Sequence, residues 1–245
     1  MLRNAFRDRL GRYISLTPEE KAALDGVLGP ERRLKPGGVL IAEGDPEPQL
    51  YIIQHGWMHT SRRLNEGPRQ IVRFHYAGDL AGTSSIAWNR AAATMTAISD
   101  CTVCDVTKTD LGRMMGAYPR LAALLYAVAA AEAVAMSDRL TSVGRTDARV
   151  RLVTLLLDII ARLRVTAGGI VDAFDLPLTQ SDIADAVGLT SVHVNRTLRA
   201  LERDGLIERH GRRVRILKEA EQAEAVGFVD RYAEVATDWL PPPGR

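Results

Sequence analysis

The sequence predicts an α+β protein in which an antiparallel β-barrel or jelly roll is followed by helices. Short apolar or alternating runs separated by turn signals occupy the chain from Leu34 to Val106. After Thr109 the apolar residues recur about every 3.5 residues, which is typical of helices. Hydrophobic residues make up 46% and charged residues 25% of the 245 residues. This ordinary globular composition excludes a largely disordered chain.

The strand-like runs are short and closely spaced, as they are in barrels and jelly rolls. A helix is expected before them, because Thr17 can cap a helix whose first residue is Pro18. The predicted strands lie at residues 39–41, 50–53, 57–61, 70–75 and 94–106.

A long helix is predicted next, because apolar residues recur there at alternating steps of three and four. They are Leu121, Leu124, Val128, Ala131 and Ala135. This is the a/d pattern of a coiled coil, and eight alanines within residues 122–135 would let two such helices approach closely. We expect a homodimer through this helix, and the alternative is a helix packed inside its own domain. No apolar run is long enough to span a bilayer, so we expect no membrane partner.

The last third of the chain contains a pattern for two short helices joined by a tight turn. Thr179 and Thr190 can cap the two helices. Ala184 permits close approach, Gly188 supplies the positive φ of the turn, and Val194 fills the space between the helices. The sequence therefore predicts a helix-turn-helix. The alternative is a helical hairpin that only packs.

Positive charge is concentrated in the same segment. The formal net charge of the whole chain is only +2, yet residues 190–218 contain eight basic and three acidic residues. A DNA-binding surface requires such a local excess. Two short strands around His210-Gly211 indicate a β-hairpin wing. We expect the second helix to enter the major groove of DNA while the wing holds phosphates.

The runs Leu178 to Ala184, Gly188-Leu189-Thr190 and Asn195-Arg196-Thr197-Leu198 resemble the winged helix of Crp/Fnr-family transcription regulators. The order of barrel, long helix and winged helix agrees with that family. The resemblance covers roughly residues 10–218. It implies a sequence-specific transcription regulator that binds a two-fold symmetric operator in double-stranded DNA as a homodimer. RNA polymerase is the expected partner of an activator.

On this basis we expect four regions. They are a cyclic-nucleotide-binding-like sensor domain over residues 1–115, a dimerisation helix over 116–144, a winged helix-turn-helix DNA-binding domain over 145–218, and a C-terminal helix and tail over 219–245. The C-terminal helix is predicted from apolar residues at helical spacing. These are Ala225, Val229, Tyr232, Ala236 and Trp239.

The resemblance also suggests how DNA is recognised. The expected base-reading residues are Ser191, His193, Asn195 and Arg196, and the expected phosphate contacts are Thr179, Thr190, Arg199, Arg209, Arg212, Arg213 and Arg215. The arginine that commonly reads guanine in the family is retained as Arg196, whereas Val192 replaces the usual glutamate. Because valine can contact only a thymine methyl group, we expect an operator that departs from the family consensus.

The sensor domain lacks the family's cyclic AMP motif. Members that bind cyclic AMP carry a Gly-Glu-Leu loop followed by Arg-Ser or Arg-Ala, whereas this chain has Gly82-Thr83-Ser84 and Ala91-Ala92. Thr83 cannot bind a ribose hydroxyl as a carboxylate does, and Arg90 stands one position early, which turns a strand side chain to the other face. We therefore expect no control by cyclic AMP. The candidate pocket for an unknown small-molecule effector consists of Gly82, Thr83, Ser84 and Arg90.

Cysteines and histidines leave two alternatives open. Cys101 and Cys104 point to opposite faces of a strand, so we interpret them as small buried residues, with a redox or metal role as the alternative. Two cysteines are too few for the family's iron–sulfur cluster, which needs four.

Histidines at 55, 59 and 75 could contribute to a metal centre. The competing function is therefore a metal-dependent barrel enzyme with an accessory DNA-binding domain. No nucleophile–base pair is evident, so we expect no enzyme activity, no cofactor and no metal. Without a secretory signal, we expect a cytoplasmic location.

Overall fold

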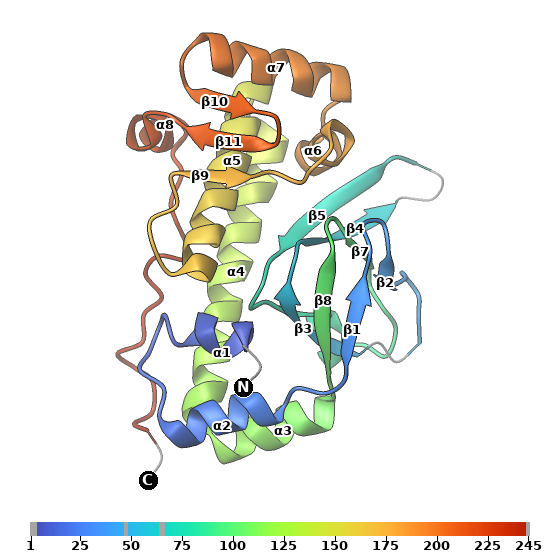
Figure 1. Cartoon of the computed structure of the whole chain (residues 1–245), viewed down its shortest axis with the longest axis vertical. Coiled ribbons are helices and arrows are strands. Elements are labelled where there is room, and N and C mark those ends of the chain that lie inside the picture. Colours follow the sequence, from blue (N-terminus) through green and yellow to red (C-terminus); the bar gives the residue numbers. More distant parts are fainter. Residues whose placement is uncertain (1–3, 47–48, 64–66, 244–245) are drawn as a thin grey trace. The chain divides into compact units, whose positions relative to one another are not determined.

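The computed structural model describes residues 4–46, 49–63 and 67–243 and divides into two compact units. The first unit comprises Met1–Arg62, Val72–Ala131 and Val235–Arg245, and the second comprises Arg63–Ile71 and Glu132–Glu234. Figure 1 labels the elements of both units.

The first unit is built from two four-stranded sheets, in the orders β1-β8-β3-β6 and β2-β7-β4-β5. The first sheet contains β1 (Glu31–Leu34), β3 (Leu50–His55), β6 (Leu80–Ala81) and β8 (Cys101–Val106). The second contains β2 (Val39–Ile41), β4 (Met58–Arg63), β5 (Arg69–His75) and β7 (Thr94–Ala97). A 3-10 turn, η1 (Thr83–Ile86), follows β6, and the helices are α1 (Ala5–Leu10), α2 (Pro18–Gly26) and α3 (Lys108–Ala117). The predicted antiparallel β-domain is confirmed.

Two apolar clusters stabilise this unit. One fills the space between the sheets and includes Tyr51, Ile53, Met58 and Val103. The other joins α1, α2 and α3 to the long helix α4 (Pro119–Arg145), whose Leu121 is fully buried.

Part of the dimer seam that was predicted on the long helix is wrong. Leu121, Leu124 and Val128 are buried in the core of their own unit, as the alternative interpretation required. The large apolar side chains that α4 leaves exposed are Tyr126, Val134, Met136 and Leu140. By length and composition alone α4 could cross a bilayer, but apolar helices of soluble proteins share that property.

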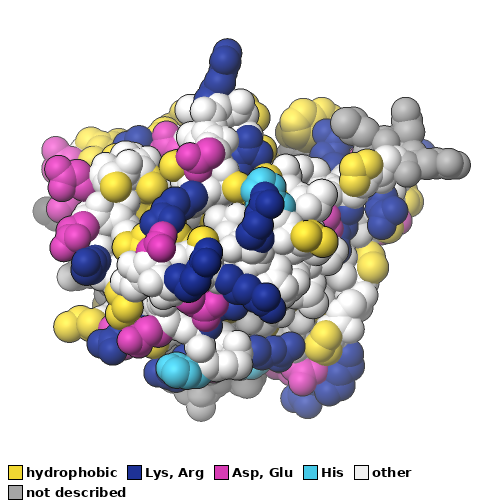
Figure 2. Space-filling view, turned by 90° about the horizontal axis from the view of Figure 1, so that it is seen from above, with side chains coloured by type: hydrophobic (Ala, Val, Ile, Leu, Met, Phe, Trp, Pro, Cys, Tyr) yellow, Lys and Arg dark blue, Asp and Glu magenta, His cyan; other side chains and the backbone are white. Residues whose placement is uncertain are grey.

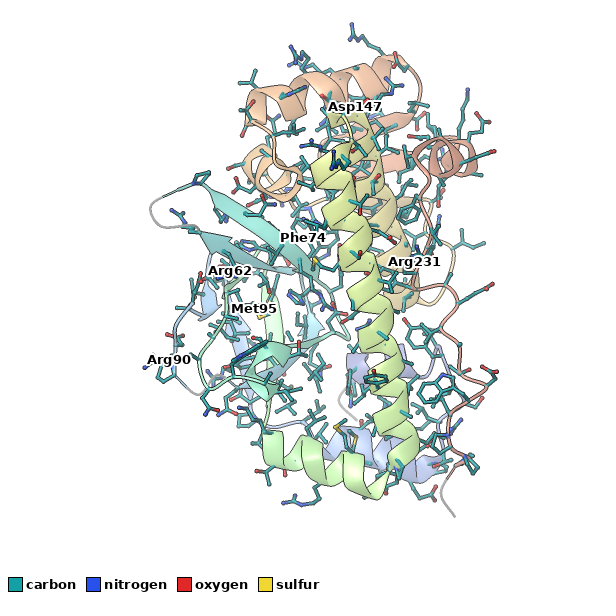
Figure 3. All side chains as sticks on the ribbon, turned by 180° about the vertical axis from the view of Figure 1, so that it is seen from behind. Arg62, Phe74, Arg90, Met95, Asp147 and Arg231 are labelled. Carbon is teal, nitrogen blue, oxygen red and sulfur yellow. The ribbon has the colours of Figure 1, made fainter. Side chains whose placement is uncertain are left out.

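The second unit is arranged around α5 (Ala148–Ala167), which packs against α6 (Gln180–Val187), α7 (Ser191–Arg203) and α8 (Glu219–Val226). Asp147 caps the start of α5 and lies at its junction with α4 (Figure 3). A three-stranded sheet in the order β10-β11-β9 forms the wing. Its strands are β9 (Ala173–Asp175), β10 (Ile207–His210) and β11 (Arg213–Ile216).

The helix-turn-helix has the predicted local chemistry. The Thr179 hydroxyl accepts from the Asp182 backbone N–H at 3.1 Å, and the Asp182 carboxylate accepts from the Thr179 N–H at 3.0 Å. Gly188 ends α6 at φ 67°, in the left-handed region that favours glycine, and Thr190 caps α7. Val194 is fully buried between the elements.

Three features differ from the sequence-based expectations. The first is that β1, β6 and β9 were not predicted. The second is that the run 94–106 is two strands, β7 and β8, rather than one. The third is that the predicted C-terminal helix through Trp239 is wrong, because α8 ends at Val226 and Gly227 follows at φ 65°. Beyond it, the Asp230 side chain accepts backbone hydrogen bonds from Tyr232 and Ala233, which forms a turn instead of a helix.

Replacing Gly188 tests the turn of the helix-turn-helix. Gly188→Ala is expected to lower the free energy of unfolding by about 1–2 kcal/mol, because a Cβ is disfavoured in the left-handed region. The matched control is Gly112→Ala within α3, where a Cβ meets nothing within 4 Å. It should raise that free energy by about 0.5–1 kcal/mol. Urea denaturation measures both values, and equal stability of the two variants would contradict this account of the turn.

Candidate nucleic-acid interface

The outer face of α7, together with the first residue of α6, lines a groove of about 730 Å³. The opposite face of α7 is apolar and buried. The residues that line the groove are Gln180, Ser191, Val192, Asn195, Arg196, Arg199, Glu202 and Arg203. Figure 2 looks onto the face of the second unit that carries α7 and shows Lys and Arg side chains on it.

Three of the four expected base-reading residues lie together in this groove. Ser191 and Asn195 are half-buried, and Arg196 is exposed. His193 is half-buried on the same helix outside the groove lining, and its backbone carbonyl accepts the Thr197 hydroxyl at 2.9 Å. The Asn195 amide donates to the side-chain oxygen of Gln180 at 3.4 Å, which links the two helices across the groove.

The arginines expected to contact phosphates differ in whether an acidic side chain already pairs with them. Arg199, Arg212 and Arg213 are exposed and have no acidic partner among the residues that the structure describes. Arg209 forms an ion pair with Glu202 at 2.9 Å, and Arg215 lies 3.6 Å from Asp172.

The two expected hydroxyl contacts, Thr179 and Thr190, lie at the starts of the two helices. Backbone N–H groups at helix starts bind anions such as phosphate, so both positions suit a DNA backbone. The Thr179 hydroxyl is already occupied locally, because it donates to the Asp182 carboxylate at 2.7 Å.

Two carboxylates on α6 share one arginine partner that the sequence alone did not identify. Arg69 on β5 contacts Asp182 and Asp185, each at 2.7 Å. Burial alone would raise the pKa of Asp182, but hydrogen bonds from Thr179 and Arg69 outweigh it and hold that pKa below its usual range. The ion pairs offset part of the negative charge that would otherwise repel DNA phosphates.

Gln180 was also missed. It follows the capping threonine directly, so its position in the first turn of α6, next to the second helix, is the sequence signal that could have identified it. No local pattern could have identified Arg69, because more than 110 residues separate it from its partners.

The expected effector residues do not all meet in one place. Gly82 begins the turn η1, which contains Thr83 and Ser84. Arg90 is exposed and donates to the Gly44 carbonyl oxygen at 3.0 Å, on the outside of the barrel (Figure 3). Its neighbour Ala91 is buried in the apolar cluster between the sheets.

Both cysteines of the barrel are buried, and one of its histidines has a local hydrogen-bond partner. Cys101 and Cys104 are free thiols, and burial raises the pKa of both, which disfavours the reactive thiolate. His75 lies 2.7 Å from the Thr60 hydroxyl. Among the residues that the structure describes, no three His, Cys, Asp or Glu side chains could hold a metal ion.

Comparisons with known proteins match both halves of this description. Residues 150–221 match the Crp-like helix-turn-helix domain, and residues 31–118 match the cyclic nucleotide-binding domain. The chain is 33% identical over 209 residues to the probable transcriptional regulator flp of Lacticaseibacillus casei, covering 84% of this chain and 90% of that protein. It is 32% identical over 180 residues to the nitrogen fixation regulation protein FixK of Bradyrhizobium diazoefficiens, covering 74% and 75% of the two chains.

Comparison with solved structures agrees with these sequence matches. The solved structure of FixK2 from Bradyrhizobium japonicum has a TM-score of 0.71 at 26% identity, and the match covers 80% of this chain and 96% of that one. The winged helix and its arginine-rich outer face therefore define a DNA-binding transcription regulator. The chain belongs to the Crp/Fnr family of transcription regulators. Because its relatives are regulators and not enzymes, the metal-dependent enzyme is set aside.

Proposed function

We propose that the protein is a homodimer that binds a two-fold symmetric DNA operator by placing α7 of each protomer in the major groove. The observation that carries this proposal is the outer face of α7, where Ser191, Asn195 and Arg196 line one groove beside exposed basic residues. A helix in the major groove needs such a row of polar side chains on the face opposite its buried one.

Each base-reading residue has a preferred partner. Arg196 can donate two hydrogen bonds to the O6 and N7 atoms of guanine, and Asn195 can pair with adenine. Val192 is 81% exposed, an unusual position for valine, and it suits contact with a thymine methyl group. Ser191 and His193 complete the proposed set.

The proposed phosphate contacts surround this set. Arg199 lies on α7, and the others lie on the wing or at the helix starts. They are Thr179, Thr190, Arg209, Arg212, Arg213 and Arg215. Such contacts fix the register of the protein on DNA without reading its sequence.

The dimer is proposed to form along an exposed stripe of α4 that runs from the first unit into the second. The stripe consists of Tyr126, Ala130, Ala133, Ser137, Leu140 and Gly144, all exposed. Their spacing alternates between four and three residues, which is the repeat of a coiled-coil seam. Tyr126 and Leu140 are 73% and 74% exposed, and the small residues between them permit close approach of a second copy.

The sensor is proposed to respond to something other than cyclic AMP. Ala91 stands where the family's phosphate-binding arginine is expected, and it is buried among apolar side chains. Gly82, Thr83, Ser84 and Arg90 remain candidate contacts for an unidentified small molecule. If the protein is an activator, RNA polymerase is its proposed protein partner. The proposed location is the cytoplasm.

Substituting Arg196 tests base reading. Arg196→Ala is expected to weaken operator binding by about 1–3 kcal/mol and to abolish discrimination at one base pair of each half-site, because the bidentate guanine contact is lost. The matched control on the wing is Arg212→Ala. It should weaken binding to all sequences alike and reduce the slope of log affinity against log salt by about one. Competition binding with operators altered one base pair at a time measures both effects. An equal loss on operator and random DNA for Arg196→Ala would contradict its assignment to a base.

Substituting Leu140 tests the dimer seam. Leu140→Asp would bury an unpaired carboxylate in the interface, at a cost of about 3 kcal/mol or more, so the dimer dissociation constant should rise about 100-fold. Leu140→Met should leave that constant nearly unchanged. Sedimentation velocity over a range of protein concentrations measures it. A dimer of Leu140→Asp as tight as the wild type would exclude this face of α4 from the interface.

A further inference from the structure

Helices α4 and α5 form a hairpin whose two ends are held in different ways. At one end only Thr146 and Asp147 connect the helices. At the other end Glu132 on α4 lies 3.9 Å from Arg162 on α5. Each of these two residues is 14 or 15 positions from the connection, or about 20 Å along its helix. Closer to the connection, Arg139 on α4 also donates to the Ala186 carbonyl oxygen on α6 at 3.1 Å, and α6 packs against α5. A hairpin fixed only in this region could change its angle, so contacts at the far end help to decide how firmly α5 is held.

The C-terminal segment makes contacts with both helices, with α4 about midway along the hairpin and with α5 at the far end. The Arg231 guanidinium contacts the Asp138 carboxylate on α4 at 2.7 Å. Figure 3 labels Arg231 beside α4. The Arg162 guanidinium on α5 lies 4.4 Å from the ring centroid of the neighbouring Tyr232. Two adjacent residues thus hold one helix each.

The two contacts differ in strength. Tyr232 and Arg162 are only 9% and 4% exposed, so their cation–π contact is shielded from water. The Arg231–Asp138 pair is more exposed, and such pairs contribute little. Tyr232 is therefore the principal contact of this segment.

The family resemblance does not account for this segment. The match to the Crp-like helix-turn-helix domain ends at residue 221, and the segment begins after α8, which ends at Val226. Its turn is nevertheless well defined, because the Asp230 carboxylate accepts from the Tyr232 backbone N–H at 2.8 Å.

We propose that Tyr232 and Arg231 are positioning residues for DNA binding, which fix the angle between α4 and α5 and thereby the half-site spacing that the dimer accepts. The proposal rests on the dimer proposed above. In that dimer α4 is held by its partner copy, and α7 packs against α5. The angle between α4 and α5 then determines the distance between the two copies of α7, and hence between the half-sites that they contact.

The experiment measures affinity for a series of operators whose half-sites are moved apart or together by one base pair at a time, and for a single half-site. One base pair rotates a half-site by about one-tenth of a turn, so a rigid dimer should lose about tenfold or more per step away from its optimum. Wild type and Tyr232→Phe, which retains the ring, are expected to show this sharp optimum. Tyr232→Ala is expected to vary less than about threefold across the series, with unchanged affinity for the single half-site.

Two results would overturn the proposal. One is a Tyr232→Ala profile as sharp as the wild-type profile. The other is an equal loss at every spacing and on the single half-site, which would indicate a structural role only. If circular dichroism shows Tyr232→Ala to be unfolded, Tyr232→Leu decides, because it keeps an apolar side chain at this position and removes only the cation–π contact with Arg162. A flattened profile for Tyr232→Leu with unchanged affinity for the single half-site would support the proposal, and an unchanged profile would overturn it.

If the proposed dimeric function is itself wrong, the experiment gives a different result. A wild-type protein that binds every spacing equally would contradict the two-fold dimer itself, before any variant is compared. A wild type with a sharp optimum that every variant shares would contradict only the positioning role.

Discussion

The DNA-binding region depends on the burial of one face of α7. Val194, Leu198 and Leu201 are each at most 2% exposed, and α7 packs against both α5 and α6. Because apolar residues recur at helical spacing, their burial turns the opposite face of α7 outward, with Arg196 and Arg199 on it. The core thus fixes the orientation of the recognition surface, while the residues on that surface contribute little to the core. Sequence specificity can therefore vary without loss of the fold.

Charged residues are also distributed differently between the interior of the second unit and its recognition surface. Acidic residues near α7 are paired within the second unit: Asp182 and Asp185 with Arg69, and Glu202 with Arg209. Several arginines of the outer face and the wing have no such partner among the described residues. A nearly neutral chain can therefore present a positive surface to DNA, because part of its negative charge there is compensated internally.

What the sequence predicted well was local. The helix-turn-helix followed from caps at Thr179 and Thr190 and from a glycine whose φ only glycine adopts easily, and all three signals act within a few residues. What it missed depends on distant partners. The strand β1 has the sequence Glu-Arg-Arg-Leu, which has no apolar pattern, and its pairing with β8 makes it a strand.

Two helices also show what the sequence alone could not predict. Because α4 has apolar residues on two sides, periodicity alone could not tell the face that packs inside its own unit from the face left uncovered. The C-terminal helix was predicted from apolar spacing, but Gly227 and the side-chain hydrogen bonds of Asp230 end it early. In the candidate site, Arg196 could be predicted from its position in the motif. Arg69 could not, since only the fold brings it to α6.

Selection of binding sites from random duplex DNA at physiological salt, with protein that carries no added ligand, tests the central claim most directly. The account predicts enrichment of a palindrome whose half-sites are centred about one helical turn, or 10–10.5 base pairs, apart. Each half-site should contain a guanine whose replacement is tolerated only by Arg196→Ala. Enrichment of a single asymmetric site, or of sequences that share no base pairs, would contradict recognition by two symmetric copies of α7.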